Sequence, residues 1–364
     1  MTKKDSAALK GVAILMMLWH HNFLPGRYEQ YFIRFWPFDA FGVVQLAIFF
    51  KICVSLFAFI SGYGLFCSWQ KRDEGLSGGA WTASRLVSTL STYWLVVVLS
   101  WIVCAVLDGR TLTFYAGHGK VFGLWHMALD FFGLSHFFGV ELFNVTWWYM
   151  SAAIAFVLLA PVLASAARRW GGFAMAALVL LAVRLASGGV CPGNTSPFSF
   201  VGAFALGMAF AQGDVFTRFR TRIRGWRAVG AFLIGTAAVY ALFLLNWQLP
   251  EETWWDVKYA LIPAAVILYL QAFILPLPVV RPVLCFLGKH ATNIFLVHTF
   301  IRYYYFADLT YRFGRWSFAA TIVFLLAASI ALSYGILLLK KLLRYDALIE
   351  RLQRRIRSDR LQAA

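Results

Sequence analysis

The stretch from residue 41 to residue 66, FGVVQLAIFFKICVSLFAFISGYGLF, decides the class of fold, because it is apolar almost throughout and carries a single charge, at Lys51. A helix of about 20 apolar residues crosses the hydrocarbon core of a bilayer. Similar runs recur along the chain and predict ten transmembrane helices, at 7–24, 41–66, 86–107, 146–166, 172–187, 198–213, 228–246, 257–275, 283–306 and 316–340. We therefore expect an all-α, polytopic integral membrane protein.

The composition agrees with this class. Of the 364 residues, 61% are hydrophobic and 13% are charged, whereas soluble domains carry about 25% charged residues. The net charge of +17 does not indicate nucleic-acid binding, because the Lys and Arg residues lie in short loops between the apolar runs and in the C-terminal tail. We expect one membrane-embedded domain over residues 1–340.

The distribution of basic residues predicts the orientation. With ten spans and a cytoplasmic start, 23 Lys and Arg residues face the cytoplasm and eight lie outside, as the positive-inside rule requires. We therefore expect both termini in the cytoplasm, and we expect the protein in a bacterial inner membrane. The basic tail, 341–364, is either an amphipathic helix on anionic lipid headgroups or a solvated end.

The segment 121–138 leaves the topology open, because it is aromatic and broken by glycines. It is either an eleventh span or a short helix on the membrane surface. An extra span would move the later basic clusters to the outside, so the charge distribution favours the short helix. The first apolar stretch lacks a small-residue cleavage site and is expected to be an uncleaved span.

Several kinds of site have no support in the sequence. The five cysteines occur singly, without the paired spacing of a zinc site or a redox pair. We find no phosphate-binding glycine loop, no metal-ligand spacing and no nucleophilic serine elbow. The sequence therefore predicts no metal and gives no indication of a hydrolase.

Lys10 and His21 are the first candidates for chemistry. They are eleven residues apart, so in a helix they share a face to within roughly 20° and lie about 16 Å apart along the axis. Lys10 would lie at the cytoplasmic end and His21 near the outer end. Alternatively, Lys10 serves only as a positive charge that fixes the topology, and His21 only as an aromatic residue at the membrane interface.

Lys51 lies near the middle of the second expected span, where an ammonium group costs about 3 kcal/mol on insertion scales. It is expected to face the interior of the bundle and pair with a carboxylate or a substrate group. The alternative is that its stem reaches an interface.

His298 would reach the same depth as His21, and an imidazole can serve as a general base near neutral pH. A structural histidine bonded to a backbone carbonyl is the alternative. Arg184 and the run Trp147, Trp148 and Tyr149 would also line the outer side, either stacking on a sugar ring or forming an aromatic belt.

Four segments together resemble the membrane-bound acyltransferase 3 family, across nearly the whole chain. They are LKGVAILMMLWHH, with Lys10 where the family more often has arginine; FAFISGYGLF, with Ser61; TWWYMSAAIAFVLLAPVL; and FLGKHATNIFLVHTF, which contains the family's late Gly-to-His segment with its histidine at His298. One departure concerns ASRLVSTLSTYW. It keeps Arg85 but has Ser88 where the family commonly has a second arginine.

The resemblance implies transfer of an acyl group, usually acetyl from acetyl-CoA, to a hydroxyl or amine of a carbohydrate or lipid-linked glycan. His21, with His298, would be the base, and Lys51 would stabilise the oxyanion or the acyl carbonyl. Lys10, Arg85 and Ser61 would bind the acyl-CoA. The alternatives are a transporter or flippase, and a non-catalytic membrane partner in a glycan-synthesis complex.

Overall fold

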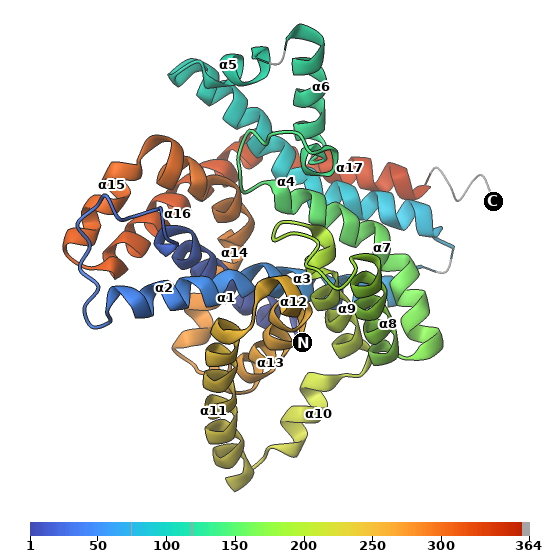
Figure 1. The fold of residues 1–364 in the computed structure, drawn as a ribbon. Helices are drawn as coiled ribbons and strands as arrows, with labels where there is room; N and C mark the ends of the chain where they lie inside the picture. Colours follow the sequence, from blue (N-terminus) through green and yellow to red (C-terminus); the bar gives the residue numbers. More distant parts are fainter. Residues whose placement is uncertain (74, 118, 359–364) are drawn as a thin grey trace.

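The computed structural model describes residues 1–73, 75–117 and 119–358, and all regular structure in these ranges is helical (Figure 1). The α-helices are α1 (Lys3–Phe23), α2 (Ala40–Phe49), α3 (Cys53–Gln70), α4 (Gly78–Leu107), α5 (Arg110–Ala116), α6 (Lys120–Phe131), α7 (Trp148–Trp170), α8 (Gly172–Ala186), α9 (Pro197–Gln212), α10 (Val215–Arg222), α11 (Trp226–Gln248), α12 (Glu251–Asp256), α13 (Ile262–Tyr269), α14 (Val280–Thr299), α15 (Ala307–Arg312), α16 (Phe318–Leu342) and α17 (Tyr345–Ser358).

Each of the ten expected spans coincides with helix. Within the described ranges, seven helical stretches are long and apolar enough to cross a membrane, and the pair α9 and α10, bent by 63°, gives an eighth if it is one span. Helix α8 has only 15 residues, and α1 begins with charged residues and carries two histidines in its last turn. The all-helical membrane class is thus confirmed, and the count of ten stays a prediction.

The segment 121–138 does not form a span. It folds as α6, of 12 residues, and a 3₁₀ turn, Ser135–Phe138. At 1.5 Å per residue α6 is about 18 Å long, which is less than the hydrocarbon core of about 30 Å. With α5 it projects from the bundle at the top of Figure 1.

Two close helix crossings hold the centre of the bundle. A Cβ atom added to Gly11 would overlap the backbone of Leu284, and one added to Gly288 would overlap that of Ala7, so α1 and α14 touch backbone to backbone. Helices α3 and α9 cross in the same way at Gly62. Small residues permit such approaches between membrane helices.

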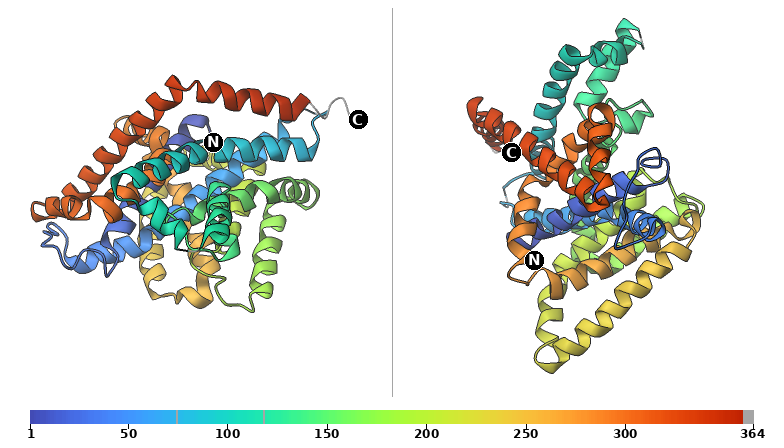
Figure 2. Two further views of the ribbon diagram at one scale, coloured as in Figure 1. Left: turned by 90° about the horizontal axis from the view of Figure 1, so that it is seen from above. Right: turned by 90° about the vertical axis from the view of Figure 1, so that its left-hand side faces the viewer.

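The tail forms α17 over Tyr345–Ser358, and residues 359–364 lie outside the described part. Its placement on anionic lipid headgroups stays a prediction. In Figure 1 and Figure 2, α17 runs beside α4. Gln353 Nε2 donates to the carbonyl oxygen of Ser84 at 3.1 Å, and the Tyr345 hydroxyl donates to that of Ser91 at 2.7 Å. The tail is therefore fixed to the bundle.

Candidate active site

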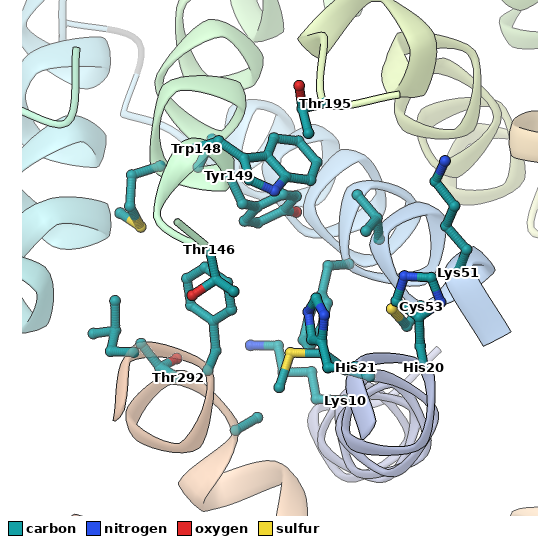
Figure 3. Close-up of a pocket in the computed structure, with 18 of the residues that line it drawn as sticks. Lys10, His20, His21, Lys51, Cys53, Thr146, Trp148, Tyr149, Thr195 and Thr292 are labelled. Carbon is teal, nitrogen blue, oxygen red and sulfur yellow. The ribbon is translucent and has the colours of Figure 1, made fainter. Parts of the chain in front are cut away.

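A cavity of about 780 Å³ lies between α1, α3, α4, α7 and α14 (Figure 3). Helix α1 lines it along much of its length, from Lys10 to His21. Ser61 of α3 and Thr92 of α4 contribute to its wall, as does Thr195 from the loop before α9. One continuous space therefore joins residues that the sequence places at opposite ends of the first helix.

Lys10 and His21 share a face of α1, as their spacing predicts, because both line this cavity. In Figure 3 the ammonium of Lys10 points into the space between α1, α7 and α14. Among the described residues, no carboxylate forms an ion pair with it. Lys10 is thus a cation available to an anionic ligand in the cavity.

The ring of His21 stacks on that of His298, with centroids 5.2 Å apart and planes at 27°. No hydrogen bond within the described ranges engages a ring nitrogen of His21. The buried guanidinium of Arg302 donates a hydrogen bond to the backbone oxygen of His21 at 2.9 Å. His298 and Arg302 therefore fix the position of His21, and its two ring nitrogens remain available to a ligand.

His298 is fully buried behind His21 and does not line the cavity. Its Nδ1 donates to the carbonyl oxygens of Phe295 and Ile294, at 2.9 and 3.1 Å. The Thr299 hydroxyl then donates to Nε2, at 3.3 Å. This is the backbone-bonded arrangement that the sequence left as the alternative, and it makes His298 a support for His21.

His20 is a second imidazole in the cavity wall, which no pattern in the sequence marks as a site residue. Its Nδ1 lies 2.7 Å from the carbonyl oxygen of Ala47. Because a carbonyl can only accept, Nδ1 carries the proton and Nε2 keeps its lone pair in the neutral ring. The only sequence signal for His20 is its position beside His21.

Lys51 lies in a 3₁₀ turn, Phe50–Ile52, that joins α2 to α3, and its side chain reaches the cavity. Its ammonium pairs with Glu251 at 2.9 Å and lies 5.0 Å from the centre of the Tyr259 ring. The expected interior orientation and carboxylate partner are confirmed. Glu251 was missed because it lies at the start of a helix 200 residues away.

The aromatic run at the start of α7 divides between two environments. Trp148 and Tyr149 line the cavity, whereas Trp147 does not. Trp147 is buried, and its Nε1 donates to the carbonyl oxygen of Leu296 at 3.1 Å. Trp147 therefore ties α7 to α14, and the two residues after it are placed to meet a ligand.

Two predicted site residues lie away from this cavity. Arg184 pairs with Asp256 at 2.8 Å and donates to the Thr253 carbonyl at 3.2 Å, so it joins α8 to α12. Arg85 lines a separate hollow, about one turn nearer the start of α4 than the cavity residues Ser88 and Thr89. The structure thus does not bring Arg85 and Lys10 together.

A buried carboxylate supports the wall formed by Tyr93, which lines the cavity. The Tyr93 hydroxyl donates to the backbone oxygen of Asp130 at 2.5 Å, and the Asp130 carboxylate accepts from Tyr115 at 2.7 Å and Ser135 at 2.6 Å. Burial raises the pKa of Asp130, against the lowering effect of the hydrogen bonds from Ser135 and Tyr115. The network anchors α6 to α4.

Arg27 also lines the cavity and was not predicted. It lies in the loop after α1, 5.9 Å from the centre of the Tyr303 ring, and joins no ion pair among the described residues. In the sequence, a basic residue just after a transmembrane helix is usually explained by membrane topology. No sequence pattern therefore indicated that Arg27 belongs to a site.

The site thus combines in one cavity free imidazole nitrogens, aromatic faces and two cations that have no carboxylate partner in the described part of the chain. No curated protein and no solved structure shows a significant match to the chain. Residues 5–338 match the acyltransferase domain model of the acyltransferase 3 family, which covers nearly the whole sequence. The chain therefore belongs to the acyltransferase 3 family of membrane acyltransferases.

Proposed function

We propose that the protein moves an acyl group, acetyl in the first instance, from cytoplasmic acyl-CoA to a hydroxyl of a surface or lipid-linked glycan. The observation that carries this proposal is the single cavity that contacts both Lys10 and His21. About 16 Å of helix separates these residues, so a donor entering at Lys10 and an acceptor entering at His21 can meet in one space.

His21 acts as the general base in this proposal. Its free ring nitrogen takes the proton from the acceptor hydroxyl as the oxygen attacks the thioester carbonyl carbon. The carbon–sulfur bond of the resulting tetrahedral intermediate then breaks. The departing thiolate takes the proton back from His21, which leaves an O-acyl glycan, free coenzyme A and a neutral imidazole.

The other cavity residues bind the two substrates. Lys10 attracts the anionic donor, and Ser61 lies in the wall of the same cavity. Trp148 and Tyr149 offer faces on which a sugar ring can stack. Lys51 lies close to His20 in Figure 3 and stabilises negative charge that develops on the acyl oxygen.

We expect Lys51→Met to lower acyl transfer about 100-fold, because a donor to a developing oxyanion contributes about that much or more to kcat. The same change also leaves Glu251 without its partner, so a second variant is needed. The double variant Lys51→Met, Glu251→Leu removes both partners of the ion pair. Ester formation by the single and double variants, compared at matched membrane levels, separates a role of Lys51 at the oxyanion from a role as the partner of Glu251. Recovery in the double variant would make Lys51 a structural partner only.

Membrane vesicles with the cytoplasmic face outward test the whole proposal. Acetyl-CoA labelled in the acetyl group is added outside, and the lumenal glycan is assayed for label that hydroxylamine releases. Labelled ester in vesicles with the protein, and none when labelled acetate replaces acetyl-CoA, is the expected result. Glycan that crosses the membrane without gaining ester would favour the transporter or flippase instead.

A further inference from the structure

A second hollow, of about 290 Å³, opens between the end of α3, the start of α4 and the tail helix α17. Four cations line it: Lys71, Arg72, Arg85 and Arg357. Asp73 is the one carboxylate among its described lining residues, and the ion pairs within the described ranges include none of the four cations. The hollow therefore carries an excess of positive charge.

The guanidinium groups are held in place. Arg357 Nε and Nη2 both donate to the Ser84 hydroxyl, at 3.1 and 2.9 Å. Arg72 lies 3.8 Å from the centre of the Trp69 ring and donates to its carbonyl oxygen at 3.2 Å. Arg85 lies 5.6 Å from the Trp81 ring, and its buried Nε has no hydrogen-bond partner among the residues that the structure describes.

Such a set of fixed guanidinium groups suits a phosphate, which accepts several charge-assisted hydrogen bonds at once. We propose that this hollow is a phosphate-binding site, and that α17 completes it by supplying Arg357. The family match ends at residue 338, so α17 lies beyond the matched region. Ser88, three residues after Arg85, lines the other cavity, whereas Arg357 of the tail lines this hollow together with Arg85.

Two helices connect this hollow with the active-site cavity. Helix α4 lines the hollow with Arg85 and the cavity with Ser88, about 4.5 Å further along its axis. Helix α3 lines the hollow with Ser68 and the cavity with Ser61, about 10 Å away. A long ligand with phosphates at one end could thus place its other end in the cavity.

The phosphate can come from two sources. One is the nucleotide end of coenzyme A, and that assignment rests on the proposed function. The other is the headgroup of an anionic phospholipid, since α17 and the basic ends of α3 and α4 belong to the side on which the sequence places the cytoplasmic leaflet. Both sources present the same group to the same cations.

The experiment uses the full-length protein in nanodiscs and the variant Arg357→Gln. Arg351→Gln is the matched control, because Arg351 is exposed on the same helix and outside the hollow. In phosphatidylcholine nanodiscs, the Kd for coenzyme A is expected to rise about tenfold for Arg357→Gln and to stay unchanged for Arg351→Gln. Arg357→Lys, which keeps the charge, should recover part of the loss.

Nanodiscs that contain phosphatidylglycerol provide the second arm. If the source is the lipid, phosphatidylglycerol raises the Tm of the wild type and of Arg351→Gln, but not that of Arg357→Gln. A wild type that binds no coenzyme A but shows this lipid effect would count against acyl-CoA as donor and leave the phosphate site standing. Coenzyme A affinity and lipid response that are the same in Arg357→Gln and Arg351→Gln would overturn the site.

Discussion

Replacement of His21 by alanine is expected to lower acyl transfer by about 10²–10⁴-fold, the range that general base catalysis contributes. In the proposed reaction, the imidazole is the part of His21 that takes the proton of the acceptor. Its main chain stays in α1, where Arg302 contacts the backbone oxygen. The measurement is ester content of the glycan in cells that express wild type or variant at equal membrane levels.

The control for His21→Ala is coenzyme A binding, which should remain within about twofold of wild type because the donor enters at Lys10. His20→Ala distinguishes the two cavity imidazoles. His20 is held by the Ala47 carbonyl, and we expect its loss to raise the KM for the acceptor more than it lowers kcat. Full ester content with His21→Ala would remove His21 as the base.

The second large effect is expected at Gly288, where alanine should destabilise the protein. A Cβ atom there would overlap the backbone of Ala7, and backbone cannot move aside as a side chain can. Overpacking costs about 1–3 kcal/mol in ordinary cores, and we expect the upper end or more at this crossing. The Tm of the purified protein should fall by several degrees.

Gly335→Ala is the matched control, because Gly335 lies in α16 and a Cβ atom there would meet nothing of the described chain within 4 Å. Alanine also favours helix over glycine by about 1 kcal/mol, so the Tm of this variant should hold or rise slightly. Equal Tm values for the two variants would show that α1 and α14 can separate without cost.

The sequence predicted best what depends on spacing within one helix. The interval between Lys10 and His21 determines their shared face through helix geometry alone, and the cost of burying Lys51 predicted an interior partner. The apolar runs located the helices. They could not settle how many cross the membrane, because α1 and α8 are too polar or too short for a test by length and hydropathy.

The remaining features depend on contacts between distant parts of the chain. Trp147 and Trp148 are neighbours, yet a rotation of about 100° sends one into the core and the other to the cavity. Arg85 and Arg357 meet only because α17 folds back on α4. His298 has the right depth for a base, but the way its ring turns toward carbonyl oxygens depends on how α14 packs against α1.

The cavity along α1 also bears on the energetics of the cell membrane. A cavity that follows about 16 Å of a membrane helix thins the insulating layer available to hold a proton gradient. Its wall carries Lys10, Arg27 and Lys51, with Glu251 as a carboxylate beside Lys51. Fixed positive charge repels protons and sodium ions, as it does in selective pores, so Lys10 and Arg27 raise the electrostatic barrier to a cation that enters this cavity.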